Sequence, residues 1–144
     1  MTDALAEVPA WASTLLEEGR VGHLGLLDDR GAPRVLPVTY VLHAGALYSA
    51  VDEKPKRVPG AELARVRWLR ERPRAALTVD RYDDDWNALA WVQVLGTVTV
   101  LDPADDASAV RALAAKYEAY RESAPRGPLL RLAPERALHW RAAG

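Results

Sequence analysis

Basic residues that could hold a phosphate group gather in one part of the sequence. Residues 54–81 contain nine basic and three acidic side chains, a local charge of +6 in a 144-residue chain whose net charge is −1. Lys54, Lys56 and Arg57 lie where a predicted strand ends and shortly before a predicted helix. Cationic side chains and backbone N–H groups converge at such points and favour phosphate. On charge alone, a solvated helix face whose arginines pair with acids elsewhere is slightly favoured over a phosphate clamp.

A second unusual stretch, residues 80–86, contains three consecutive aspartates and a tryptophan. The aspartates lack the interleaved Asx and Gly residues of a calcium loop, so the pattern favours a solvated turn and predicts no metal site. Trp86 and Trp91 have two interpretations. Large aromatic side chains with a polar N–H serve equally in a core and at a dimer interface or ligand wall.

Several classes of chemistry are excluded or disfavoured by composition. The chain has no cysteine, which rules out disulfides, thiolate catalysis and zinc–cysteine sites. It has no P-loop and no dinucleotide-binding glycine motif. The acidic net charge disfavours nucleic acid as a partner. No apolar run reaches the roughly 18 residues of a membrane span, and the N-terminus lacks a basic signal region, so we expect no membrane association and a cytoplasmic location.

The elements that must position these residues form one predicted domain over residues 1–144. A helix follows Pro9, and strands, helices and turns are then read from apolar periodicity and from Gly and Pro. Strands are expected at 21–27, 35–42, 47–51, 75–79, 88–101 and 137–141, with helices at 61–72 and 105–121. Gly96 is expected to mark a β-bulge. Because strands mostly follow strands, the fold class is mainly β with peripheral helices (α+β), an antiparallel closed or split barrel.

The ordered strings at residues 50–57 (AVDEKPKR), 63–70 (LARVRWLR), 73–82 (PRAALTVDRY) and 91–96 (WVQVLG), with Asp85 and Trp86 between them, carry a family resemblance. Together they resemble the pyridoxamine 5′-phosphate oxidase-like proteins, specifically a branch of probable coenzyme F420-dependent enzymes from actinobacteria. The likeness extends from about Trp11 to the C-terminus. Trp68 departs from the pattern, because many members have Asn there.

This resemblance implies a split β-barrel of the FMN-binding type, a homodimer, and clefts at the subunit interface that bind FMN or F420. Backbone and side chains of two strands would line the ring system, and basic residues would hold the phosphate. Aromatic residues would come from the partner subunit. The corresponding positions are Pro37, Val38, Thr39, Tyr40, Ser49, Ala50 and Val51 for the ring, Lys54, Lys56 and Arg57 for the phosphate, and Trp86 and Trp91 for the aromatic region.

The sequence and the resemblance together favour an F420-dependent oxidoreductase that acts on a small organic acceptor. With the resemblance included, the phosphate clamp becomes the preferred interpretation of the basic segment. An FMN-dependent enzyme of the same type is the first alternative, and a non-catalytic flavin-binding carrier or sensor is the second. A cofactor that performs hydride chemistry needs little acid–base machinery from the protein. Thr39 and Tyr40 are the polar groups expected nearest the ring, and no catalytic residue is assigned.

Overall fold

The computed structural model describes residues 4–51 and 63–143 and is organised around one sheet of seven strands. Every neighbouring pair of strands is antiparallel, which confirms the expected arrangement. In spatial order, the strands are β2 (Pro33–Val38), β1 (Gly22–Leu27), β5 (Arg74–Arg81), β6 (Ala90–Leu101), β7 (Leu129–Arg141), β4 (Ala46–Ala50) and β3 (Val41–His43).

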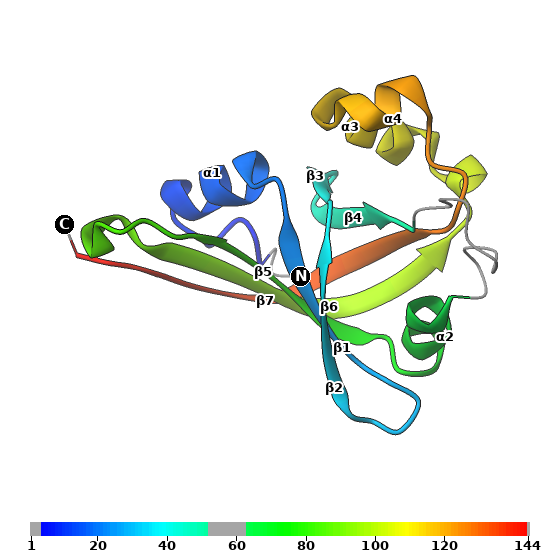
Figure 1. Ribbon diagram of the computed structural model, residues 1–144, viewed down its shortest axis with the longest axis horizontal. Coiled ribbons are helices and arrows are strands. Elements are labelled where there is room, and N and C mark those ends of the chain that lie inside the picture. The colour runs from blue at the N-terminus through cyan, green and yellow to red at the C-terminus, as the bar shows by residue number, and fades with distance from the viewer. Residues whose placement is uncertain (1–3, 52–62, 144) are drawn as a thin grey trace.

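The sheet curls because its two edge strands are consecutive in the chain. β2 ends at Val38 and β3 begins at Val41, so Thr39 and Tyr40 alone connect one edge to the other. Three residue steps span at most about 11 Å, and the two edges therefore meet at this point. The result is the expected split β-barrel with peripheral helices (Figure 1).

Four α-helices accompany the sheet in the described residues: α1 (Ala10–Glu18), α2 (Ala64–Glu71), α3 (Ala107–Lys116) and α4 (Glu118–Glu122). The first three bury residues three or four positions apart, the spacing of one helix face. These buried residues are Ala12 and Leu16, Val66 and Leu69, and Ala109 and Leu113. α1 and α2 pack on the core inside the barrel, and α3 packs on a second cluster over β3 and β4. Within the described chain, no helix combines the length and apolar character that crossing a membrane requires.

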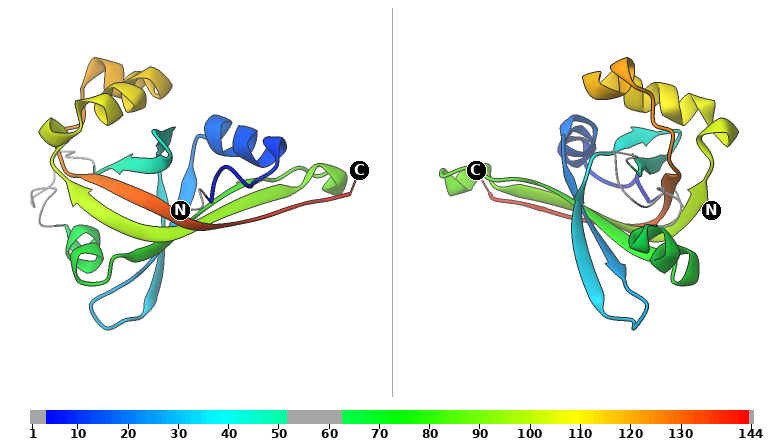
Figure 2. Two further views of the ribbon diagram at one scale, coloured as in Figure 1. Left: turned by 180° about the vertical axis from the view of Figure 1, so that it is seen from behind. Right: turned by 45° about the vertical axis from the view of Figure 1, so that its right-hand side comes forward.

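A three-stranded arm extends from the barrel. β5, the first half of β6 and the second half of β7 form it, and they stay paired as far as Arg81, Ala90 and Arg141 (Figures 1 and 2). A 3-10 turn, η2 (Trp86–Ala88), closes its tip, whereas η3 (Pro103–Asp105) precedes α3. The arm therefore carries the tryptophan and aspartate stretch away from the barrel.

Two predicted elements are interrupted in the structure. The single strand at 35–42 is wrong, because the chain breaks at Tyr40, which is fully buried and donates its hydroxyl hydrogen to the carbonyl of Leu16 at 2.6 Å. The single helix at 105–121 is also wrong, because Tyr117 is extended (φ −118°, ψ 122°) and separates α3 from α4. A buried tyrosine needs a partner for its hydroxyl, and such tertiary contacts override local propensity.

The last strand is longer than expected, and Pro134 explains the difference. β7 spans 13 residues, whereas the pattern predicted strand only at 137–141. Proline has no N–H to donate to a neighbouring strand, so its presence in a sequence argues against a strand at that position. In the structure it pairs with Gly96, where the register of β6 and β7 shifts, and proline is tolerated at such an irregularity. The irregularity predicted at Gly96 is therefore confirmed in position, although the extra residue, Glu135, belongs to β7.

Gly96 has a testable packing role, because a Cβ added there would overlap the carbonyl oxygen of Ala133 on β7. We expect Gly96→Ala to lower the free energy of unfolding by about 1–3 kcal/mol, the usual range for overpacking. Urea unfolding followed by circular dichroism measures this. Gly25→Ala is the matched control on β1, where the nearest atom to an added Cβ lies at 3.8 Å. Equal effects of the two substitutions would contradict the assigned role.

Candidate functional site

A groove of about 440 Å³ opens where β2 and β4 end. α4 borders it on one side and α2 on the other, with the end of β4 between them (Figures 1 and 2). Its volume lies within the range of small-molecule and cofactor sites. The residues that line it are Pro37, Val38 and Thr39, Ser49 and Ala50, Leu63 and Arg65, and Tyr117, Ala119 and Tyr120. Among the described residues, the groove therefore combines an apolar lining with a few hydroxyls and one cation.

Five of the predicted site residues meet in this groove. They are Pro37, Val38, Thr39, Ser49 and Ala50. They come from two segments, 37–39 and 49–50, that are 10 positions apart in sequence, and the curl of the sheet brings the ends of their strands together. Lys54, Lys56 and Arg57, predicted to bind phosphate, lie outside the described residues.

Tyr40 and Val51 follow directly after groove residues, but their side chains are buried. Tyr40 is 0% exposed, and its hydroxyl is bonded to Leu16 and does not line the groove. Val51 is 1% exposed and belongs to the core inside the barrel. Of the two polar side chains expected nearest the ring, Thr39 alone therefore lies in the groove wall.

Trp86 and Trp91 lie on the arm and not in the groove of the same chain. Trp86 is 70% exposed at the tip, and Trp91 pairs across the strands with Trp140, which is 46% exposed. The aspartates beside them form an exposed turn, as predicted. Asp83 and Asp85 each accept a hydrogen bond from a backbone N–H two residues on.

Five groove residues were missed from the sequence: Leu63, Arg65, Tyr117, Ala119 and Tyr120. Arg65 is one of the nine basic residues of segment 54–81, and Tyr117 falls within the helix predicted at 105–121. A usable signal was the pair Tyr117 and Tyr120, three residues apart near the end of that predicted helix. Their rings meet edge to face, with centroids 5.7 Å apart.

Hydrogen bonds hold the hydroxyl groups of the groove wall. The Ser49 hydroxyl donates to the carbonyl oxygen of Thr39 at 2.7 Å. Thr39 Oγ1 and the Tyr120 hydroxyl lie 2.9 Å apart and share a hydrogen bond. The Tyr117 hydroxyl accepts from the Tyr40 N–H at 3.1 Å and can donate to the carbonyl of Arg20 or of Tyr40. The wall is thus preorganised by contacts between β2, β4 and α4.

Two cations lie against tyrosine rings in and behind this wall. Lys116 Nζ lies 4.0 Å from the ring centre of Tyr40, and the Arg20 guanidinium lies 4.7 Å from that of Tyr117. Lys116 Nζ is buried and has no hydrogen-bond partner among the described residues. Burial, followed by repulsion from Arg20, lowers the pKa of Lys116 to about 8, whereas the ring faces favour its charged form.

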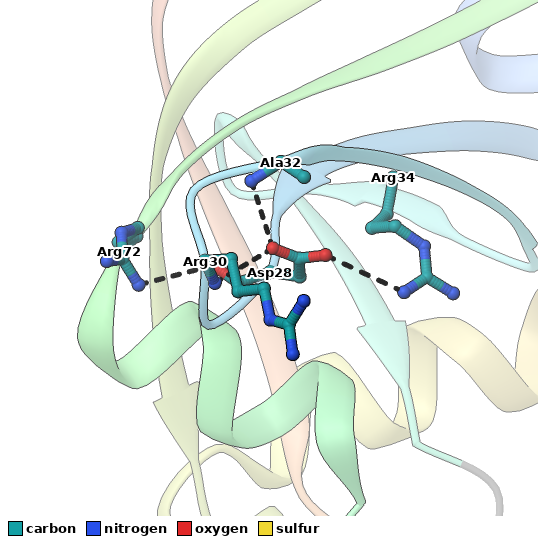
Figure 3. A network of polar contacts seen from close by, with 5 residues as sticks. All are labelled: Asp28, Arg30, Ala32, Arg34 and Arg72. Carbon is teal, nitrogen blue, oxygen red and sulfur yellow. Dashed lines mark hydrogen bonds and ion pairs between the residues drawn. The ribbon is translucent and has the colours of Figure 1, made fainter.

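A polar turn fixes the position of α2, which delivers Arg65 to the groove. Asp28, at the turn between β1 and β2, accepts hydrogen bonds from the backbone N–H groups of Arg30 and Ala32, both at 2.9 Å (Figure 3). The Ala32 N–H is the largest cause that lowers the pKa of Asp28. Arg72, which follows α2, donates to the Asp28 carbonyl at 3.2 Å (Figure 3).

Trp68 adds a second attachment between α2 and the β1–β2 hairpin. Its ring packs on the core inside the barrel, and the Arg34 guanidinium lies 4.9 Å from the ring centre. Arg34 also lies 3.8 Å from Asp28 (Figure 3). The tryptophan that departs from the family pattern is therefore part of the support that holds α2.

The curled antiparallel sheet and the groove at its strand ends define a split β-barrel protein. A family model described as pyridoxamine 5′-phosphate oxidase matches residues 10–138, and the chain therefore belongs to this family. No curated protein sequence matches the chain.

Solved structures share the fold at low sequence identity. The conserved hypothetical protein Rv2991 from Mycobacterium tuberculosis has a TM-score of 0.74 and 16% identity, over 93% of this chain and 84% of that one. An FAD-binding protein from Mesorhizobium loti has a TM-score of 0.67 and 20% identity, over 92% and 94%. A structure named F420 reductase has a TM-score of 0.66 and 18% identity, over 91% and 98%. At these identities the likeness shows the fold alone.

The buried amine behind the groove wall makes stability depend on pH in a defined direction. The pKa of Lys116 is about 8 in the folded chain and near 10.5 in an unfolded one, so between these values the unfolded chain binds a proton that the folded chain does not. The free energy of unfolding of the wild type, relative to Lys116→Met, should therefore rise from pH 8 to pH 10, by at most about 1.4 kcal/mol per pH unit. Urea unfolding at each pH measures this difference.

The control for this experiment is Arg111→Met, an exposed position on α3 whose guanidinium stays charged throughout. Its difference from the wild type should stay constant over the same range. A constant difference for Lys116→Met as well would show that the amine titrates normally.

Proposed function

We propose that the protein is an oxidoreductase that binds the deazaflavin coenzyme F420 in the groove and transfers a hydride between this cofactor and a small organic acceptor. The observation that carries the proposal is the groove itself. A flat ring system needs an apolar slot, and a phosphate tail needs cations. Pro37, Val38 and Ala50 supply the slot, Arg65 supplies a cation, and none of the described lining residues is acidic.

The family and the fold agree with a flavin-type cofactor. The chain belongs to the pyridoxamine 5′-phosphate oxidase family, and structures with this fold include one named FAD-binding and one named F420 reductase. The preference for F420 rests on the resemblance of residues 50–96 to the actinobacterial branch. FMN, which also presents a tricyclic ring and a phosphate, is the alternative. A cytoplasmic location belongs to the same proposal.

The cofactor, when bound, supplies the hydride chemistry, and the residues of this chain bind it and orient it. Arg65, together with Lys54, Lys56 and Arg57, is proposed to hold the phosphate tail. Thr39 and Ser49 offer hydroxyls to the polar edge of the ring, and the α4 side of the groove keeps water from it. This division explains why the groove lining includes no His, Asp or Glu among the described residues.

Titration of the purified protein with F420 and with FMN tests the proposal. We expect F420 to bind at micromolar concentration and the reduced cofactor to be oxidised in the presence of an acceptor from a broad panel. Tighter binding of FMN, with ordinary flavin absorption after native purification, would favour the alternative cofactor. Binding without turnover on any acceptor would favour a carrier or sensor. If neither cofactor bound at micromolar concentration, the proposal would be wrong.

Arg65 gives a residue-level test, since it is the described cation in the groove. Arg65→Ala removes a charge-assisted contact and should weaken binding of either phosphate-bearing cofactor by on the order of 1.5–3 kcal/mol. Lys56→Ala with Arg57→Ala should add to the loss. Arg70→Ala, at an exposed position of the same helix, is the matched control. Equal affinities of the Arg65 and Arg70 variants would show that Arg65 is only part of a solvated face.

We also propose that the protein is a homodimer in which the arm of each subunit contributes to the partner's site. The arm exposes Tyr82, Trp86 and Trp140 by 46–70%, and large exposed aromatic side chains are typical of interfaces. Trp86 and Trp91 lie far from the groove of their own chain, as residues supplied to a partner would. The arm's projection from the barrel leaves its aromatic tip free to reach a second copy (Figure 2).

Sedimentation equilibrium of the wild type and of Trp86→Ala tests the dimer. Buried tryptophans are frequent hot spots that contribute 2 kcal/mol or more, so we expect the dimer dissociation constant to rise about tenfold or more. Val35→Ala, which changes another exposed apolar residue on the edge strand β2, should leave it unchanged. A monomeric wild type, or equal constants for the wild type and Trp86→Ala, would contradict the proposal.

A further inference from the structure

Among the described residues, four hydroxyl side chains line the groove, and they differ in which acceptors their hydrogens reach. The Ser49 hydroxyl donates its hydrogen to the carbonyl of Thr39. The Tyr117 hydroxyl donates its hydrogen to a backbone carbonyl, that of Arg20 at 2.8 Å or that of Tyr40 at 3.0 Å. These two hydroxyls therefore have no hydrogen left for a ligand, although they keep the ability to accept.

The remaining two hydroxyls, Thr39 and Tyr120, bond to each other. A hydroxyl has one hydrogen to donate, so the pair has two, and the bond between Oγ1 and the phenol oxygen uses one of them. No acceptor for the second hydrogen is found among residues 4–51 and 63–143. The pair is half-buried at the groove wall, where a polar hydrogen without a partner is unfavourable once a ligand excludes water.

We propose that the Thr39–Tyr120 pair is a hydrogen-bond donor site for a carbonyl-type oxygen of the ligand, and that Tyr120 is a binding residue of this groove. Within a chain of two hydroxyls, the hydrogen bond between them polarises the terminal O–H and strengthens its donation. The ring of Tyr120 is held edge to face against Tyr117, which orients the phenol. The ligand class is a flat, largely apolar molecule with an oxygen acceptor on its edge.

The oxygen has two sources with the same chemistry, the ring carbonyls of the proposed cofactor and the carbonyl of an acceptor substrate. The identity of the ligand rests on the proposed function, whereas the donor site itself rests on the hydroxyl pair. Elsewhere in the described lining, the Arg65 guanidinium can donate and is proposed to hold the phosphate tail, whereas Pro37, Val38 and Ala119 cannot donate from their side chains. Among the hydroxyls of the groove, this pair therefore supplies the hydrogen for an oxygen on an apolar ligand.

A matched pair of probes tests the donor site without any cofactor. 2-Acetylnaphthalene and 2-ethylnaphthalene share the ring system and a two-carbon side chain and differ by one carbonyl oxygen. The change in the ratio of their dissociation constants between the wild type and a variant therefore reports the donor. The wild type should have a higher relative preference for the ketone than a variant without the donor. Tyr120→Phe, which keeps the ring against Tyr117, should reduce that preference by about threefold to tenfold, the usual weight of one hydrogen bond. Thr99→Val, which removes an exposed hydroxyl of β6 outside the groove lining, is the control and should leave it unchanged.

The same variants then distinguish the two sources of the oxygen. If Tyr120→Phe weakens F420 and FMN binding by a similar factor, the pair binds the ring carbonyl. If the cofactor affinities stay constant and the ketone preference on the cofactor-loaded protein falls, the pair binds the acceptor. Thr39→Val with Tyr120→Phe should cost at least as much as the larger single loss, because each single variant leaves one hydroxyl whose hydrogen the pair no longer uses.

An unchanged ketone preference in both Tyr120→Phe and the double variant, with unchanged cofactor affinities, would overturn the proposal. Thermal unfolding of each variant verifies that the fold is kept. If F420 and FMN did not bind the wild type, the proposed function would be wrong. The donor-site proposal would still be tested, because the naphthalene probes report it without a cofactor.

Discussion

The two-residue connection between β2 and β3 is the constraint on which the rest of the structure depends. Tyr40 is fully buried there, and its hydroxyl is bonded to the last turn of α1. The Tyr117 hydroxyl bonds to the backbone of Tyr40 from the α3–α4 junction. Gly19 leaves the room that the Tyr40 hydroxyl needs, since an added Cβ would press on it. One tyrosine thus joins the helix before the sheet, both edges of the sheet and the helices over β4.

This connection also explains where the groove lies. Because strand pairing is interrupted at Thr39 and Tyr40, Thr39 is left at the end of β2 with its side chain on the groove wall. Tyr40 does not contact a ligand in the groove, but its burial positions its neighbour Thr39, which lies in the groove wall. Tyr117 acts similarly, since its hydroxyl binds the connection while its ring forms part of the lining.

The strands and helices with regular periodicity were predictable, and the breaks were not. The antiparallel order and the bulge at Gly96 follow from alternating apolar residues and from the position of a lone glycine in a long strand. The break at Tyr40 could not be predicted, because tyrosine is a good strand former. The strand is interrupted there by hydrogen bonds from Tyr40 to Leu16 and Tyr117, which are distant in sequence. The first half of β7 was not predicted because Pro134 normally argues against a strand. The strand accommodates this proline because it lies at the β-bulge.

The residues of the groove also divide into those that could be predicted from the sequence and those that could not. Residues at the ends of consecutive strands, such as Thr39 and Ser49, could be placed together from topology and resemblance. Tyr120 could not, because it reaches the groove from a helix 81 positions further along the chain. Its contribution depends on which hydroxyl hydrogens the folded backbone has already used, a count that no sequence pattern contains. For the proposed redox cofactor, the groove needs few ionisable groups. Its specificity then lies in the few hydroxyl hydrogens that the folded chain leaves without an acceptor, the feature least visible before folding.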